Sequence, residues 1–359
     1  MGRQGVIAGT ALPTIQVLRG IAASLVIFYH VTTHGGAQLE IAFLDNFFAF
    51  GHSGVHVFFV LSGFVMMWAH YDDAGRTDKV WRFFRARFAR IFPLYWVLMV
   101  PYLVYYLVSP QLARVSGIEG PLDAGMITRA LLIYDQHHQP IIPVAWTLSY
   151  EILFYAFFSL YLFAGAAPFT LVSLGWCAMI VAHKAGLVHL TDLAYPFVLS
   201  PLILEFFAGC LAAVIVVRLK PASDARWLIA AAFLFLAVGI AENELLIQLK
   251  RTVHNWMVPS FLVILAAAHY DVGRRRVYPR VAMLLGDASY SLYLTHFLLL
   301  DVLLAVYVRH PWGTHARLAL LVITIVLWAC GAVTHRMLER PLLAGVRSRL
   351  GLERKATNQ

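Results

Sequence analysis

An arginine and a histidine, Arg19 and His30, share one long apolar segment near the start of the chain, LRGIAASLVIFYH. Their separation of 11 residues is close to three turns of an α-helix, so both project from one face, about 16 Å apart along the axis. An imidazole can take a proton from a hydroxyl at neutral pH, and a guanidinium can hold an anion. The pair predicts a cleft with a cationic anchor and a deeper base. The alternative is an arginine that reaches the membrane surface and an unrelated histidine.

A carboxylate lies at a comparable predicted depth in another apolar segment. Glu151, in VAWTLSYEILFY, is about two turns from the outer end of its helix, and His30 lies a similar distance from the same membrane face. We therefore expect Glu151 to pair with His30, orient the ring and stabilise its charged form. The alternative is a glutamate bonded to nearby Trp, Tyr or backbone groups.

Three shorter patterns are candidates for substrate binding. Ser62-Gly63 in FFVLSGFV marks either a small-residue contact between helices or a place where a ligand approaches the backbone beside a serine hydroxyl. Arg87 and Arg90 in RARFARIFPLYW share a helix face, so they either clamp phosphates or anchor the chain to anionic lipid. His296 in SYSLYLTH is either a substrate-binding group or a hydrogen-bonded packing residue.

Two further charged patterns are expected to be structural. Asp287 precedes SYSLYLTHF and is predicted to be the N-cap of that helix. Glu339 and Arg340, in HRMLERPL, predict an ion pair at the inner membrane surface.

Composition places these segments in a membrane. The chain has 359 residues, of which 60% are hydrophobic and 13% charged, against roughly 25% charged in soluble domains. Its mean hydropathy is +0.72. So few charges exclude soluble, disordered, fibrous and nucleic-acid-binding classes. The three cysteines lie in apolar runs without CxxC spacing, so neither a disulfide framework nor a metal site is expected.

Ten stretches are long and apolar enough to cross a bilayer, which predicts an all-α polytopic membrane protein. A further stretch at 122–133 is predicted to form a short amphipathic helix at the membrane interface. The ten stretches are 14–33, 50–70, 91–109, 144–164, 167–183, 196–217, 227–242, 255–270, 288–308 and 317–336.

Positive charge gives the orientation. With the N-terminus in the cytoplasm, 21 of the 28 Lys and Arg residues fall on the inner side and seven on the outer side. We therefore expect both termini to be cytoplasmic. The sequence divides into a transmembrane domain at 1–340 and a short basic cytoplasmic tail at 341–359.

The motifs LRGIAASLVIFYH, FFVLSGFV, RARFARIFPLYW, WTLSYEILFY, SYSLYLTH and ERP occur in this order from Arg19 to Pro341. In this set the chain resembles the membrane acyltransferase 3 family. VAWTLSYEILFY is most similar to the branch that includes exopolysaccharide-production acetyltransferases. The resemblance assigns the family's R-x10-H motif to Arg19 and His30, and its RxxR motif to Arg87 and Arg90. Its FFxxSG motif falls on Phe58, Phe59, Ser62 and Gly63.

The resemblance implies a multi-pass enzyme of the bacterial inner membrane that moves an acyl group, commonly acetyl, from acyl-CoA to a sugar hydroxyl of a surface polysaccharide or glycan precursor. Acyl-CoA is then a donor substrate, and no bound cofactor is expected. The implied partners are the glycan acceptor, the lipid bilayer and polysaccharide synthesis or export machinery, without nucleic acid. Many relatives carry an additional SGNH domain, for which no room is expected before Gln359.

Two other classes fit buried Arg, His and Glu residues. A transporter or flippase for a glycan or acyl donor would use them as substrate or coupling sites. A membrane scaffold for a polysaccharide synthase would use them structurally. The absence of internal repeats and of paired broken helices argues against a transporter.

Overall fold

The computed structural model describes residues 11–109, 123–134, 140–188, 197–219, 224–244, 253–272, 276–310 and 315–352. These residues contain helices and connecting segments but no β-strand. Nine helical segments in this part of the chain are long and apolar enough to cross a membrane, and Trp256–Asp271 is a shorter apolar helix. Together these ten match the ten predicted stretches, which confirms the all-α polytopic class.

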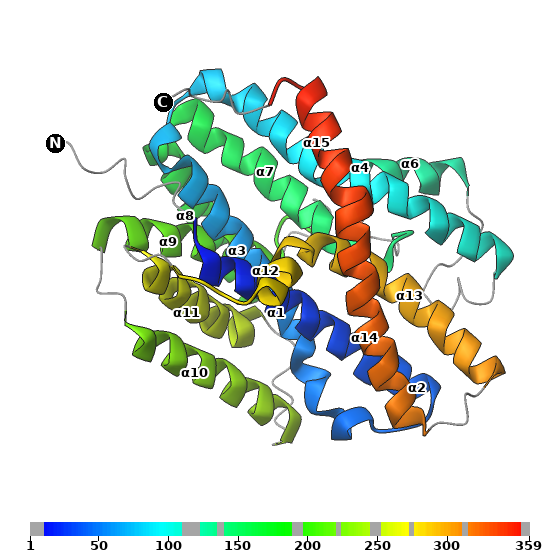
Figure 1. Ribbon diagram of the computed structural model, residues 1–359. Helices are drawn as coiled ribbons and strands as arrows, with labels where there is room; N and C mark the ends of the chain where they lie inside the picture. The colour runs from blue at the N-terminus through cyan, green and yellow to red at the C-terminus, as the bar shows by residue number, and fades with distance from the viewer. Residues whose placement is uncertain are drawn as a thin grey trace.

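The centre of the bundle is built around two helices. They are α1 (Pro13–His30) and α3 (Ser53–His70), which pack against each other. Helix α9 (Leu202–Leu219) and helix α11 (Val253–Asp271) both cover α3, while α13 (Ser289–Arg309) packs against α1. Figure 1 shows α1 and α3 crossing the middle of the molecule, with α9 and α11 beside them.

Helices α3 and α9 approach each other through glycines. A Cβ atom built on Gly63 would lie 1.9 Å from the carbonyl oxygen of Phe206, and one on Gly209 would lie 1.9 Å from that of Val60. No side chain fits at either position without separating the helices. Membrane helices commonly associate through such small residues because close backbone approach increases van der Waals contact.

A long helix, α4 (Thr77–Val108), forms part of the wall of the cavity that is described in the next subsection. The predicted third span at 91–109 is the second part of this helix, so the arginines that precede Pro93 belong to the same element. Helix α4 packs against α7 (Trp146–Ala164), which in turn packs against α8 (Ala166–Lys184). The predicted helix at 122–133 is present as α6 (Ala124–Leu132), and the Asp123 side chain accepts from the Met126 amide at its N-terminus.

The last helices form a continuous rod. Helix α14 (Ala316–Thr334) passes through a π-helical segment (His335–Glu339) into α15 (Arg340–Arg349), on the near side of the molecule in Figure 1. The predicted tail at 341–359 thus begins inside α15, which packs against α4. The remaining elements are α2 (Gly36–Gln38), α10 (Ala225–Glu244), α12 (Arg280–Asp287), a π-helical segment (Val31–Gly35) and 3-10 segments (Phe43–His52, Tyr71–Asp73 and Pro143–Ala145).

Candidate active site

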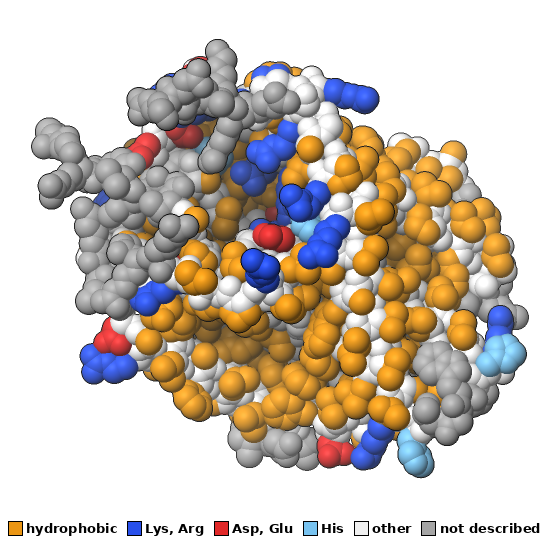
Figure 2. Space-filling view, in the orientation of Figure 1, with side chains coloured by type: hydrophobic (Ala, Val, Ile, Leu, Met, Phe, Trp, Pro, Cys, Tyr) orange, Lys and Arg blue, Asp and Glu red, His pale blue; other side chains and the backbone are white. Residues whose placement is uncertain are grey.

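An open cavity of about 920 Å³ lies between α1, α3, α4, α7, α9 and α13. Three arginines, Arg19, Arg87 and Arg90, contribute positive charge to its wall, and most of the other lining side chains are aromatic or aliphatic. Figure 2 shows Lys and Arg side chains gathered around a hollow in the upper part of the face, above a mainly hydrophobic surface. Seven of the ten candidate site residues line the cavity: Arg19, Phe58, Phe59, Ser62, Arg87, Arg90 and Glu151.

Glu151 is held by the cavity wall and not by His30. The Ser62 hydroxyl donates to its Oε1 at 3.1 Å, and the Tyr155 hydroxyl donates to the same oxygen. The predicted pairing of Glu151 with His30 is therefore wrong, because Glu151 lines the cavity, where Ser62 and Tyr155 donate to it, whereas His30 contacts Val26 and His296. Among the described residues that line the cavity, Glu151 is the sole carboxylate.

Tyr155 is a site residue that was not predicted from the sequence. Thr147, Glu151 and Tyr155 are spaced four residues apart on α7, so they share a helix face, and all three line the cavity. This spacing of polar residues in an apolar helix was the available signal. Tyr290 and Tyr293 of α13 are three residues apart and also line the cavity. They too were not predicted from the sequence.

Arg90 is fixed by an ion pair. Its Nη1 donates to Oε1 of Glu339 at 2.5 Å, while Ser291 at 2.7 Å and His335 at 2.8 Å contact the other carboxylate oxygen. Glu339 is 3% exposed, so this carboxylate is satisfied almost entirely by protein groups. The predicted ion pair of Glu339 with Arg340 is wrong: the π-helical segment turns Glu339 toward α4, whereas Arg340 is exposed.

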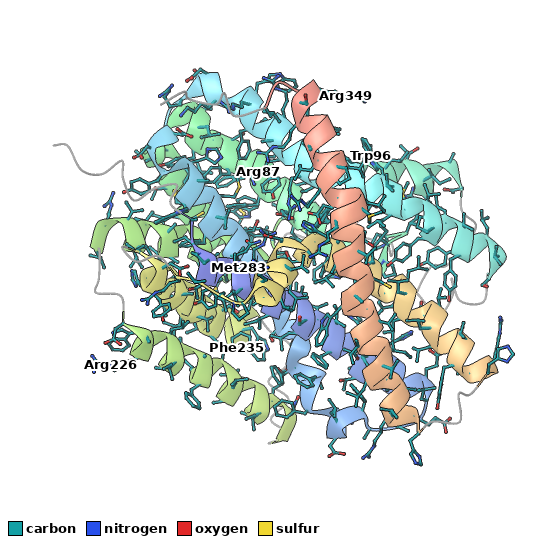
Figure 3. The ribbon with its side chains drawn as sticks, viewed as in Figure 1. Arg87, Trp96, Arg226, Phe235, Met283 and Arg349 are labelled. Atoms are coloured by element: carbon teal, nitrogen blue, oxygen red, sulfur yellow. The ribbon has the colours of Figure 1, made fainter. Side chains whose placement is uncertain are left out.

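Arg87 lines the cavity and lies against two aromatic rings. Its guanidinium lies 5.6 Å from the ring centre of Phe83 and 5.5 Å from that of Tyr155. Its Nε is buried and has no hydrogen-bond partner among the described residues. Figure 3 labels Arg87 in the upper part of the bundle, where α4 and α7 pack together. The Phe83 and Tyr155 rings orient the guanidinium of Arg87, but they carry no negative charge that would neutralise it.

Arg19 is positioned through a glutamine. Its Nη1 lies 3.4 Å from Oε1 of Gln16, whose Nε2 donates to Asp287 at 2.6 Å. The prediction that Asp287 caps α13 is wrong, since Asp287 ends α12 and α13 follows without a side-chain cap. Gly286 brings α12 close to α1, because a Cβ there would lie 2.1 Å from the Gln16 carbonyl oxygen.

The two candidate histidines form a pair beside the cavity. Nδ1 of His30 lies 3.1 Å from Nε2 of His296, and neither residue is among those lining the cavity. His296 is fully buried, so its side chain has no surface open to a ligand in this structure, and its role in substrate binding stays a prediction. Tyr293 connects the two regions, since it lines the cavity and its ring centre is 6.0 Å from that of His296.

Gly63 is a packing residue. It faces α9 at the close contact described above, whereas the neighbouring Ser62 faces the cavity. Of the two interpretations of FFVLSGFV, the structure supports the contact between helices for the glycine, while a role of Gly63 in substrate binding stays a prediction. Adjacent residues on a helix point about 100° apart, so the serine and glycine serve different surfaces.

These features define a polytopic membrane protein with a cationic cavity and an adjoining histidine pair. The family model described as an acyltransferase domain matches residues 12–334, so the chain belongs to the membrane acyltransferase 3 family and is an acyltransferase. It is 28% identical to the acyltransferase MdmB of Streptomyces mycarofaciens, over 92% of each chain. It is 30% identical to the exopolysaccharide production protein ExoZ of Rhizobium meliloti (strain 1021), over 84% of this chain and 92% of ExoZ.

A third relative is a putative acetyltransferase, ORF330, of Acidianus two-tailed virus, 27% identical over 81% of this chain and 84% of the relative. No solved structure matches the chain significantly. The relatives bear out the family and its exopolysaccharide-related branch.

Proposed function

We propose that the protein transfers an acyl group, commonly acetyl, from acyl-CoA to a sugar hydroxyl of a surface polysaccharide or glycan precursor. The observation that carries this proposal is the cavity with Arg19, Arg87 and Arg90 on an otherwise mainly aromatic and aliphatic wall. Coenzyme A combines phosphates with a long flexible arm, and arginine is well suited to phosphate because its planar donors bind two oxygens at once.

The arginines have different parts in donor binding. Arg90 already has a carboxylate partner, so Arg87 and Arg19 supply most of the charge available to the donor phosphates. The apolar wall formed by Phe58, Phe59 and Phe206 accommodates the arm of the donor. Because each guanidinium is fixed by rings or by a neighbouring side chain, little side-chain entropy is lost on binding.

His30 is the proposed base. It takes the proton of the sugar hydroxyl as the hydroxyl oxygen attacks the thioester carbon. The C–O bond forms, the C–S bond breaks, and the proton passes to the departing thiolate, so the products are the ester and free coenzyme A. A positioned base of this kind contributes typically about 10²- to 10⁴-fold to rate.

The proposed glycan acceptor is inferred from similar proteins. ExoZ is a production protein for an exopolysaccharide, which supports a glycan acceptor for this chain. We place the enzyme in the bacterial inner membrane with both termini in the cytoplasm, where acyl-CoA is made. A separate polysaccharide synthesis or export assembly then supplies or removes the glycan.

Thioester turnover tests the donor. Purified protein in lipid nanodiscs is given acetyl-CoA and glycan fragments, and free thiol is measured. Arg87→Ala should raise KM for acetyl-CoA about tenfold or more with a smaller effect on kcat, because a phosphate contact is lost in ground and transition states alike. The matched control is Arg82→Ala, which removes an exposed arginine of the same helix. His30→Ala should abolish transfer and leave coenzyme A binding intact.

The outcomes separate enzyme from transporter. No thiol release with any glycan fragment, together with movement of glycan or donor across the membrane in vesicles, would favour a transporter. Equal KM values for the Arg82 and Arg87 variants would remove the proposed donor site. The acceptor is identified by comparing glycans of a deletion strain and its complement by mass spectrometry and NMR, where one acyl group should be lost and regained.

A further inference from the structure

Three contacts fix the arrangement of hydrogens on the histidine pair. Nδ1 of His30 lies 2.9 Å from the carbonyl oxygen of Val26, one turn earlier on α1. Nδ1 of His296 lies 3.1 Å from the carbonyl oxygen of Leu292, one turn earlier on α13. The third contact, at 3.1 Å, joins Nε2 of His296 to Nδ1 of His30.

Carbonyl oxygens only accept hydrogen bonds, so each Nδ1 carries a hydrogen and donates. A neutral imidazole has a single N–H, which leaves Nε2 of both rings with a lone pair. His296 is fully buried and has no carboxylate contact among the described residues, so its neutral form is the stable one. Its Nε2 is therefore an acceptor, and the Nδ1–H of His30 donates to both Val26 and His296.

We propose that Nε2 of His30 is the atom that takes the acceptor proton, and that His296 is a positioning residue that holds His30 in this tautomer. This proposal rests on the function proposed above and adds an atomic assignment to it. In serine hydrolases a carboxylate does the corresponding work. Here a neutral imidazole does it, so the group that holds the base carries no negative charge.

The surrounding packing holds the pair in place. Helix α13 packs against α1, and the Phe297 ring lies edge-on to His30 with ring centres 5.2 Å apart. A π-helical segment, Val31–Gly35, begins directly after His30. Such segments occur often at functional sites because they change which way the following side chains face.

Two substitutions of similar chemistry test the role of His296. The amide of glutamine reaches the position of Nε2, whereas that of asparagine reaches only the position of Nδ1. His296→Gln therefore keeps an acceptor for His30, and His296→Asn keeps only the contact with Leu292. We expect His296→Gln to hold kcat within about tenfold of wild type and His296→Asn to lower it a further ~10- to 100-fold, both with unchanged KM for acetyl-CoA.

The controls separate positioning from folding. The same two substitutions at His310, which is exposed, should leave kcat unchanged. His296→Asn and His296→Gln should also bind coenzyme A equally well by calorimetry. Equal kcat values for the asparagine and glutamine variants at position 296 would overturn the proposal.

A second measurement does not depend on acyl transfer. Nitrogen-15 NMR of histidine-labelled full-length protein in nanodiscs distinguishes N–H from lone-pair nitrogens, and the His30 signals are assigned by their loss in His30→Ala. We expect Nδ1 of His30 to carry the hydrogen in wild type. A hydrogen on Nε2 would overturn the inference even if transfer is active, whereas an inactive wild type with the expected tautomer would refute the proposed function alone.

Discussion

Removing the Glu339 carboxylate should destabilise the protein more than most single substitutions. Glu339 contacts Arg90, Ser291 and His335 at 2.5–2.8 Å and is nearly inaccessible to solvent. Breaking a buried ion pair by deleting one partner typically costs about 3–5 kcal/mol, because the other charge stays without compensation. The Arg90 side chain is 27% exposed, so water recovers part of its hydration, and we expect about 3 kcal/mol for Glu339→Ala.

Graded variants show where this energy comes from. Glu339→Gln keeps an acceptor for the Ser291 hydroxyl but loses the charge, and should cost about half as much. Ser291→Ala should cost about 0.6 kcal/mol, the average for hydrogen bonds measured within membrane helices. Replacing both Arg90 and Glu339 with leucine should cost less than the sum of the single changes by about 1–3 kcal/mol.

The assay is equilibrium unfolding in bicelles, followed by tryptophan fluorescence and circular dichroism. Arg340→Ala is the matched control, since Arg340 is the next residue and exposed, and it should change the free energy of unfolding by less than about 0.5 kcal/mol. A cost below about 1 kcal/mol for Glu339→Ala would refute the reasoning. It would mean that Arg90 is held by other contacts.

Three further predictions concern packing, charge and topology. Gly63→Ala should cost about 1–3 kcal/mol of unfolding free energy and weaken coenzyme A binding, because α3 and α9 must separate beside the cavity; normal values for both would contradict the close packing. Glu151→Gln should strengthen coenzyme A binding about two- to tenfold in calorimetry, because a negative charge leaves the cavity that we propose holds phosphates; weaker binding would argue against that site. Reporter fusions at Gln359 and in the connection 110–143, between the predicted third and fourth spans, should lie on opposite membrane faces, and a common face would exclude the proposed orientation.

The parts of the site that sequence predicts are those carried by a single helix. Arg19 lies in the cavity wall and His30 lies three turns further on one uninterrupted helix, as their spacing requires. Ser62, Arg87 and Glu151 reach the cavity because each projects from a regular helix whose apolar surroundings were evident. The same spacing rule would have identified Tyr155.

Contacts between distant helices could not be predicted in this way. Arg90 and Glu339 are 249 residues apart in the chain, and the π-helical segment that turns Glu339 inward has no clear sequence signal. The mistaken pairing of Glu151 with His30 came from comparing depths measured from predicted helix ends. Helix α1 in fact continues through a π-helical segment past His30, so distance from the helix end did not give a common depth.

Helix α1 sets the distance between the two halves of the site. Arg19 in the cavity and His30 in the histidine pair are separated by 11 residues of continuous helix, which is about 16 Å along the axis. A rigid helix cannot bring the cationic group and the proposed base together, so one ligand reaches both only if it is long. Acyl-CoA meets this requirement, because its flexible arm separates the phosphates from the thioester. A small donor such as an acyl phosphate does not, since an anion held at Arg19 would keep its acyl carbon far from His30.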